Sequence, residues 1–213
     1  MNQNIFSLAR ENPPIPGCTI SRKLFENDEA CSLLFSLAEG TGISDTAYER
    51  EHFFYLLAGK LTIHQGKDFH LKAGDFYLAA PKEELNVKAE KDAIYMEIGF
   101  KKEDFTMNTI NEKNIFALKD LVPCSEGRII NRNLIDTEKV HFAVLSLAKG
   151  TSLPEHAAPR DALLFSLEGE GLITREGKTY ILKAGENFAM KTGDRHSVKA
   201  EKDFKFALLL TEE

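Results

Sequence analysis

The chain has few of the features that mark secreted, membrane-spanning or nucleic-acid-binding proteins. Its three cysteines, Cys18, Cys31 and Cys124, form no CxxC spacing, and an odd number cannot all pair within one chain. We therefore expect reduced cysteines in a cytoplasmic protein. No apolar stretch approaches the roughly 20 residues that a membrane-spanning helix needs. Residues 1–4 show neither the basic nor the apolar region of a secretory signal, so none is expected.

Clustered positive charge is also missing. The net charge is −6, and no run of lysine and arginine is longer than two residues. Binding to a phosphate backbone requires a clustered basic face, so a nucleic-acid partner is not expected. No G-x-S-x-G, G-x-G-x-x-G, P-loop or H-E-x-x-H motif occurs. The motif search therefore assigns no catalytic residue, and whether the protein is an enzyme stays open.

What the chain does contain is one long segment written twice. The offset between the copies is 110 residues in the early blocks and 111 in the later ones. A unit of this length exceeds a solenoid repeat and has the size of a small domain. We therefore predict two copies of one domain, residues 1–106 and 107–213. The matching blocks are NIFSL (4–8) and NIFAL (114–118), LKAG (71–74 and 182–185), and VKAEKD (87–92 and 198–203).

Each copy has the pattern of a β protein. Apolar runs of strand length are separated by glycine and charged turns, about every 8–12 residues, which is typical of antiparallel sandwiches and barrels. Residues 65–67 (QGK) and 175–178 (REGK) are predicted hairpin turns, because glycine adopts the positive φ that a tight reversal requires. The fold class is therefore predicted to be all-β.

The spacing in the second copy resembles the two motifs of the cupin superfamily. Gly150, His156 and Gly169 fit the first motif, and Gly185 and His196 fit the second. The resemblance covers nearly the whole chain and implies two tandem double-stranded β-helix (jelly-roll) barrels. In cupins three histidines and a glutamate converge on a divalent metal inside the barrel.

Only part of that ligand set is present. His156 and His196 stand at two of the four ligand positions, while Ala158 and Ala162 replace the second histidine and the glutamate. In the first copy no ligand position is kept, so no metal is expected there. The residues at its four positions are Thr46, Tyr48, His52 and Leu85.

The two copies also differ in the size of the side chains predicted to line the barrel. Large residues should fill the first interior, whereas small ones should leave space beside His156 and His196 in the second. We therefore expect the working site in the second barrel, unless residues such as Phe188, Met190 or Phe206 fill it. The paired positions are Tyr48 and Ala158, His52 and Ala162, Phe54 and Leu164, and Leu56 and Ser166.

These observations leave three functions open. The first is binding of a small molecule in the second barrel by His156, Ser166 and His196, with Ala158 and Ala162 lining the site. The second is a dioxygenase, isomerase or decarboxylase in which His156 and His196 bind one divalent transition metal, Zn, Fe, Ni, Mn or Cu. Two imidazoles alone would hold such an ion weakly. The third is a structural module, and homodimerisation is compatible with all three.

Overall fold

A computed structural model describes residues 5–101, 103 and 113–212. The chain divides into two compact units. The N-terminal unit is Ala9–Ala117, and the C-terminal unit is Leu118–Glu212 together with the described residues up to Leu8. The predicted boundary between residues 106 and 107 lies outside the described residues. None of the helices in the described part of the chain has the length and hydrophobicity that a membrane crossing demands.

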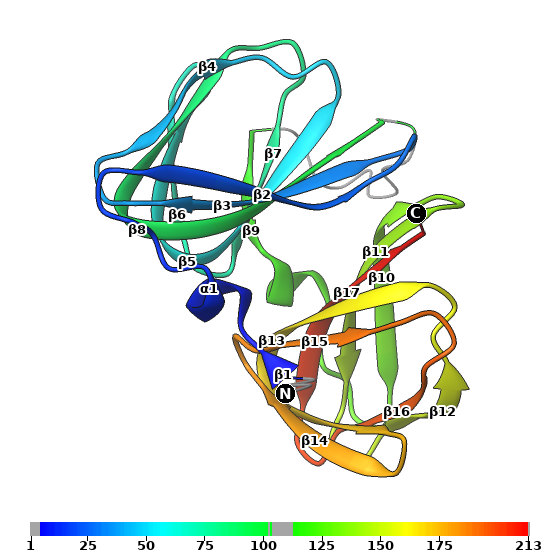
Figure 1. The fold of residues 1–213 in the computed structure, drawn as a ribbon. Helices are drawn as coiled ribbons and strands as arrows, with labels where there is room; N and C mark the ends of the chain where they lie inside the picture. Colours follow the sequence, from blue (N-terminus) through cyan, green and yellow to red (C-terminus); the bar gives the residue numbers. More distant parts are fainter. Residues whose placement is uncertain (1–4, 102, 104–112, 213) are drawn as a thin grey trace. The chain divides into compact units, whose positions relative to one another are not determined.

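The N-terminal unit is an antiparallel sheet with strand order β2-β3-β8-β5-β7-β9, in which β4 pairs with β8 and β6 with β5 (Figure 1). The long strand β5 pairs with β7 through its first half and with β6 through its second half, so the sheet curls around its core. The strands are β2 (Thr19–Glu26), β3 (Cys31–Leu37), β4 (Gly42–Thr46), β5 (Glu51–His64), β6 (Asp68–Lys72), β7 (Asp75–Ala79), β8 (Leu85–Phe100) and β9 (Ile115–Ala117), and the short helix α1 is Leu8–Glu11.

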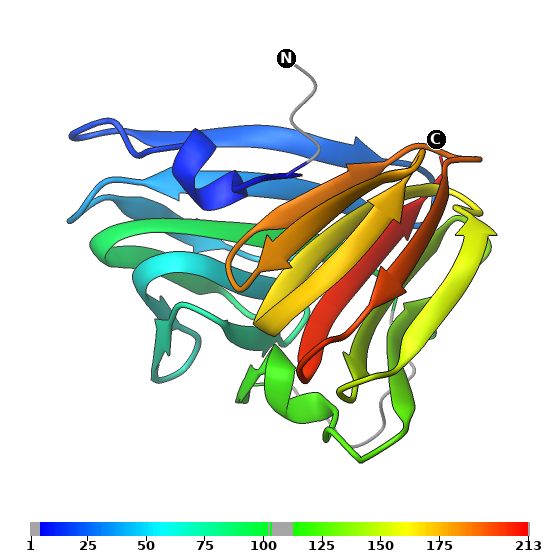
Figure 2. The same ribbon diagram turned by 90° about the horizontal axis from the view of Figure 1, so that it is seen from below.

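The C-terminal unit repeats this arrangement with strand order β10-β11-β17-β13-β15-β1. In Figure 2 the yellow β13 lies between β15, in orange, and β17, in red. β14 pairs with β13, and β16 pairs with both β12 and β13. The elements are β1 (Ile5–Phe6), the 3-10 helix η2 (Leu118–Leu121), β10 (Ile129–Asp136), β11 (Val140–Leu147), β12 (Ser152–Ala157), β13 (Asp161–Arg175), β14 (Lys178–Lys183), β15 (Asn187–Met190), β16 (Arg195–Lys199) and β17 (Phe204–Thr211).

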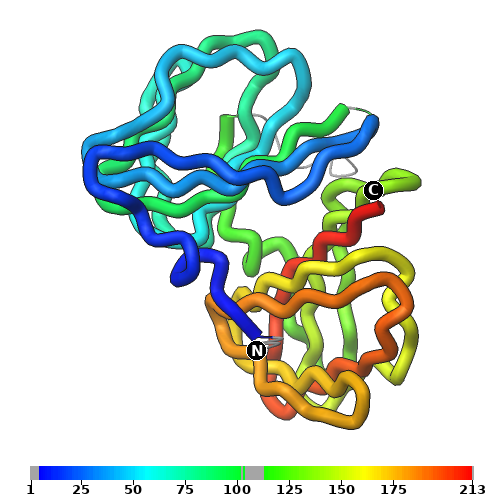
Figure 3. Tube along the Cα trace, viewed as in Figure 1, coloured from blue at the N-terminus to red at the C-terminus, as the bar shows by residue number. Residues whose placement is uncertain are grey.

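The first strand of each repeat completes the unit formed by the other repeat. β1, which opens the chain, pairs with β15 of the C-terminal unit (Figure 3). Its counterpart β9, which opens the second repeat, pairs with β7 of the N-terminal unit. The repeat pattern predicts both strands but does not predict this exchange, because the apolar spacing of a strand does not specify its partner edge.

The all-β prediction is confirmed, and every strand pair described in the two sheets is antiparallel. Both predicted hairpins are present. The β13–β14 turn has positive φ at Glu176 (52°) and Gly177 (73°), as a type I′ turn requires. The longer β5–β6 turn carries a buried amide, since Gln65 accepts hydrogen bonds from the Tyr77 hydroxyl and from the amide of Ala80.

Each unit has its own apolar core inside the curled sheet. The N-terminal core is aromatic, with Phe54, Tyr77 and Tyr95 fully buried. The C-terminal core contains Phe188, Phe204 and Phe206 together with smaller residues. Because inward and outward side chains alternate along a strand, these cores fix which polar residues face the interior.

Candidate functional site

His156 and His196 lie opposite each other on two paired strands of the C-terminal unit. They are Cα partners in the β12–β16 ladder, and their ring centroids are 4.3 Å apart. His196 is buried, with 6% of its surface exposed, whereas His156 is exposed. The two histidines that the sequence singles out therefore do form a pair.

The hydrogen bonds of the pair define its tautomers. Nδ1 of His156 lies 2.8 Å from the carbonyl oxygen of Pro154, and Nδ1 of His196 lies 3.2 Å from that of Asp194. A carbonyl oxygen only accepts, so each Nδ1 carries the proton that it donates. Burial, with a smaller contribution from His156, lowers the pKa of His196 and favours its neutral form. In the neutral ring the Nε2 lone pair is left to accept a hydrogen bond or to bind a metal.

The acidic residues near the pair are engaged elsewhere. Glu155 forms an ion pair with Arg195 at 2.7 Å, and Asp161 accepts hydrogen bonds from the backbone and hydroxyl of Thr192. Across residues 5–101, 103 and 113–212, no group of three histidine, cysteine or acidic side chains is placed to hold a metal ion. A protein metal site normally supplies at least three ligands, so the two imidazoles fit the predicted metal only in part.

The predicted small residues, Ala158 and Ala162, are both buried. Ala158 is bonded through its backbone to Gly193 and Asp194, the two residues that lead into β16. Ala162 pairs with Met190 at the start of β13. Both alanines belong to the C-terminal core, which also contains the three larger residues named above as possible fillers, Phe188, Met190 and Phe206.

Some apolar residues that pack against this core remain partly exposed, among them Leu145, Leu208 and Leu210. Their counterparts in the first repeat are Phe35, Glu97 and Gly99. The C-terminal core is therefore apolar, and these three leucines at its edge are in contact with solvent.

Ser166 lies on the same strand as Ala162. It lies four residues beyond Ala162 on β13, which corresponds to about 13 Å along a strand. Its side chain is buried, with 4% exposed, and its Oγ has no hydrogen-bond partner among the described residues. Of the predicted set, His156 and His196 are thus paired, Ala158 is bonded to the residues before β16, and Ser166 carries a buried hydroxyl.

The corresponding end of the N-terminal unit holds a different polar cluster. The rings of Tyr48 and His52 stack with centroids 3.8 Å apart, and Nδ1 of His52 lies 3.1 Å from the carbonyl oxygen of Arg50. Nε2 of His52 lies 3.6 Å from Oε1 of Glu97. His52 is thus a hydrogen-bonded interior residue, as the sequence suggests, but its acidic neighbour was not predicted.

Glu97 is a buried carboxyl group with 4% of its surface exposed. Burial raises its pKa to about 7, and a hydrogen bond with Tyr48 partly opposes this rise. Burial also lowers the pKa of His52 to about 4, so at mildly acidic pH both groups are uncharged. One sequence signal was available: an acidic residue interrupts the apolar strand AIYMEIGF, where the second repeat has Leu208.

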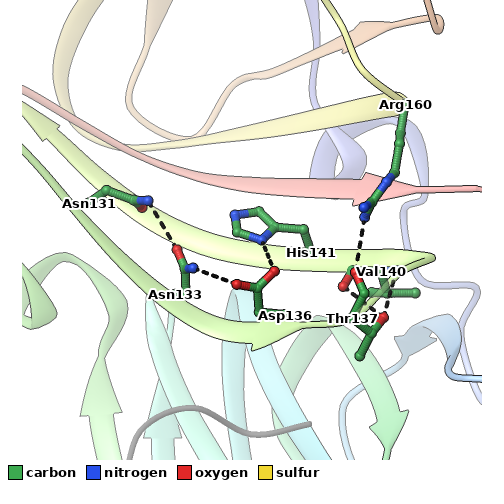
Figure 4. Close-up of polar contacts among 7 residues, drawn as sticks. All are labelled: Asn131, Asn133, Asp136, Thr137, Val140, His141 and Arg160. Atoms are coloured by element: carbon green, nitrogen blue, oxygen red, sulfur yellow. Dashed lines mark hydrogen bonds and ion pairs between the residues drawn. The ribbon is translucent and has the colours of Figure 1, made fainter.

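Three other polar side chains, two histidines and an arginine, have structural roles. Nδ1 of His141 bonds Asp136 at 3.0 Å at the β10–β11 hairpin, as Figure 4 shows. Arg160 donates to the carbonyl oxygen of Thr137 in the same hairpin (Figure 4). His64 pairs with Asp68 on the surface.

Comparison with known proteins supports a cupin fold. Residues 143–212 match the family model described as Cupin domain. A Cupin 2 conserved barrel domain protein from Leptotrichia buccalis has a similar structure, with a TM-score of 0.83 and 27% identity over 98% of this chain and 96% of that one. No curated protein sequence matches the chain significantly. The chain is therefore a cupin-fold protein.

More distant structures share the fold alone. The putative glyoxylate induced protein from Pseudomonas aeruginosa has a TM-score of 0.62 and 14% identity, covering 91% of this chain and 80% of that one. Oxalate decarboxylase from Bacillus subtilis, whose structure was determined in a study of its Mn(II) centres, has a TM-score of 0.53 and 11% identity, covering 98% of this chain and 77% of that one.

Proposed function

We propose that this protein is a two-barrel cupin whose C-terminal barrel binds a small organic molecule at the His156–His196 pair. The observation that carries the proposal is the hydrogen bonding of the pair. Both Nδ1 atoms donate to backbone carbonyls, so in the neutral form of each ring Nε2 is the acceptor, on facing strands. The tandem arrangement is supported by the repeat in the sequence and by the equivalent strand orders of the two units.

The surroundings suggest the class of ligand. Neutral imidazole Nε2 atoms accept hydrogen bonds, so they suit hydroxyl or N–H groups. The partly exposed Leu145, Leu208 and Leu210 suit an apolar body. The ligand that fits is thus a small molecule with hydrogen-bond donors at one end and a hydrocarbon portion at the other. The free cysteines agree with a cytoplasmic setting for such a binding protein.

A metal-dependent enzyme is the second candidate. Metal-binding histidines usually donate the other ring N–H to a carbonyl or carboxylate, and both members of this pair do so. Zn, Fe, Ni, Mn or Cu would then require ligands beyond the two imidazoles. The Mn(II) of oxalate decarboxylase belongs to a protein that resembles this chain in fold only. A structural module is the third candidate.

Elemental analysis and imidazole NMR separate these functions. We expect untagged protein, purified without chelator, to contain less than a tenth of an equivalent of Mn, Fe, Ni, Cu or Zn per chain. Adding catechol as a hydroxylated probe should shift the His156 and His196 ring resonances saturably. His196→Leu and His156→Thr, which install the residues of the first repeat, should abolish the shift. About one metal ion per chain, lost in both variants, would instead establish the metal site. If the protein contains no metal and catechol causes no shift, the structural module is supported.

A further inference from the structure

The N-terminal unit has a polar cluster of its own, facing the interior of the curled sheet. Tyr95 belongs to the N-terminal core, and Glu97, two residues further along β8, projects from the same face. His52 reaches this point from β5, and Gly99 makes room for it, because a Cβ there would lie 2.4 Å from Nε2 of His52. The four side chains of the cluster are Tyr48, His52, Tyr95 and Glu97.

Two polar atoms of this cluster are buried without a hydrogen-bond partner among the described residues. They are the hydroxyl oxygen of Tyr95 and Oε2 of Glu97, on side chains that are 0% and 4% exposed. Leaving a buried donor or acceptor unsatisfied is unfavourable, because the group loses its hydrogen bonds to water without a replacement. Two such atoms on one strand face are therefore better explained by a group that binds between them than by packing.

The cluster is framed by aromatic rings that reach the surface. Phe35 stacks on Tyr95 with centroids 4.9 Å apart and an interplanar angle of 9°. Phe35 and Tyr48 pack against the core but remain partly exposed. A flat aromatic ligand that binds beside Phe35 and Tyr48 would contact their π faces.

We propose that the N-terminal unit contains a second binding site, for a small uncharged aromatic molecule whose hydroxyl group bonds Tyr95 and Glu97. A hydroxyl both donates and accepts, so it can satisfy the Tyr95 hydroxyl and Oε2 of Glu97 together. A carboxylate ligand would be repelled by ionised Glu97, and an apolar ring alone would leave both oxygens unsatisfied.

The second repeat has no equivalent of this site. Phe206 and Leu208 occupy the places of Tyr95 and Glu97, and Ala158 and Ala162 those of Tyr48 and His52. The proposal therefore goes beyond the function proposed for the C-terminal unit and does not depend on it.

Phenol titration tests the site, with toluene as the matched compound that lacks the hydroxyl. We expect phenol to shift the Tyr95, Tyr48 and His52 ring resonances saturably in 1H–13C spectra. Toluene should bind at least tenfold more weakly. Tyr95→Phe, which removes one oxygen, and Glu97→Leu, which installs the residue of the second repeat, should each weaken phenol binding at least tenfold. Glu97→Gln keeps a donor and an acceptor and should stay within about threefold.

Two controls keep the outcome decisive. The amide spectrum of each variant establishes that it is folded, and His196→Leu in the C-terminal unit should leave these phenol shifts unchanged. The proposal is overturned if phenol gives no saturable shift, if toluene binds as tightly, or if Glu97→Leu binds phenol like the unmodified protein. Failure of the C-terminal site affects none of these measurements.

Discussion

At the scale of single residues, Glu97 sets the two interiors apart. Its carboxyl group is surrounded by Tyr48, His52, Tyr95 and the half-buried Cys31. Burial raises the pKa of both tyrosines and of the thiol, so these three groups stay neutral between pH 4 and 8. Only His52 titrates in the same window, with its pKa lowered to about 4.

The raised pKa of Glu97 makes stability depend on pH in a defined direction. The folded state holds the proton up to about pH 7, against an ordinary value of 4.5. Stability from this group is therefore fully present below about pH 4.5 and is lost as pH rises through 7. Between pH 4.5 and 7 the free energy of unfolding should fall by roughly 3 kcal/mol because of this group. Glu97→Gln should remove it, so the variant should gain that much relative to the unmodified protein between pH 4 and 8.

The measurement is urea unfolding of both proteins across this range. There is no tryptophan, and four of the five tyrosines lie in the N-terminal unit, so tyrosine fluorescence reports mainly on that unit. His52 has the opposite effect, because its contribution to stability falls as pH drops from 6.5 towards 4. This effect is present in both proteins, so it largely cancels in the difference between their unfolding free energies. A difference in unfolding free energy that stays constant with pH would show that Glu97 is not buried as described.

At the scale of elements, a glycine within β13 permits the close approach of the chain that leads into β17. Gly169, within β13, has φ of +77°, and a Cβ there would lie 2.1 Å from the carbonyl oxygen of Asp203. Gly185 also has a positive φ, +81°, but a Cβ there would have nothing within 4 Å. The two positions therefore share the conformational cost of a left-handed residue and differ in the clash.

Alanine substitutions at these two positions separate the conformational cost of a left-handed residue from the cost of the steric clash. Gly185→Ala should lower the free energy of unfolding by about 1 kcal/mol, the cost of a left-handed alanine. Gly169→Ala should lower it by roughly 1–3 kcal/mol more, because β13 and the residues before β17 must move apart. Urea unfolding followed by circular dichroism measures both. Equal decreases in the free energy of unfolding would mean that the backbone around Gly169 moves apart without an energetic cost.

The elements themselves follow from the sequence to a large extent, and the site does so less well. Turn chemistry at Glu176 and Gly177 fixes a hairpin locally, so it is predictable. The His156–His196 pair follows from motif spacing because the two strands are adjacent. Ser166 was grouped with them by alternation, which gives only the face on which a residue lies, so its place in the site stays a prediction. Glu97 was missed because a segment is predicted as a buried strand when most of its residues are apolar, and a single acidic residue does not change that prediction.

At the scale of the whole molecule, the exchange of β1 and β9 ties each repeat to the other. β1 is a short strand, but several contacts hold it in the C-terminal unit. Ile5 packs against the core there, and Ser7 donates to the carbonyl oxygen of Gly185. The amide of Leu8 donates to Oδ1 of Asn187 at 2.9 Å, and the side-chain amide of Asn187 donates to the carbonyl oxygen of Leu164.

Deleting residues 1–8 should therefore destabilise the C-terminal unit, although these residues are far from it in the sequence. The deletion removes one of the two strands that pair with β15. It also leaves Oδ1 of Asn187 without the Leu8 amide that donates to it, at a cost of roughly 1–3 kcal/mol for that atom plus the lost packing of Ile5. Hydrogen exchange should accelerate at amides of β13 and β15, whereas the tyrosine-detected unfolding of the N-terminal unit should keep its midpoint. Ile5→Ser should reproduce part of the loss. Accelerated exchange in β7 instead would mean that the first strand serves its own repeat, and the two units would then be consecutive in sequence rather than interlaced.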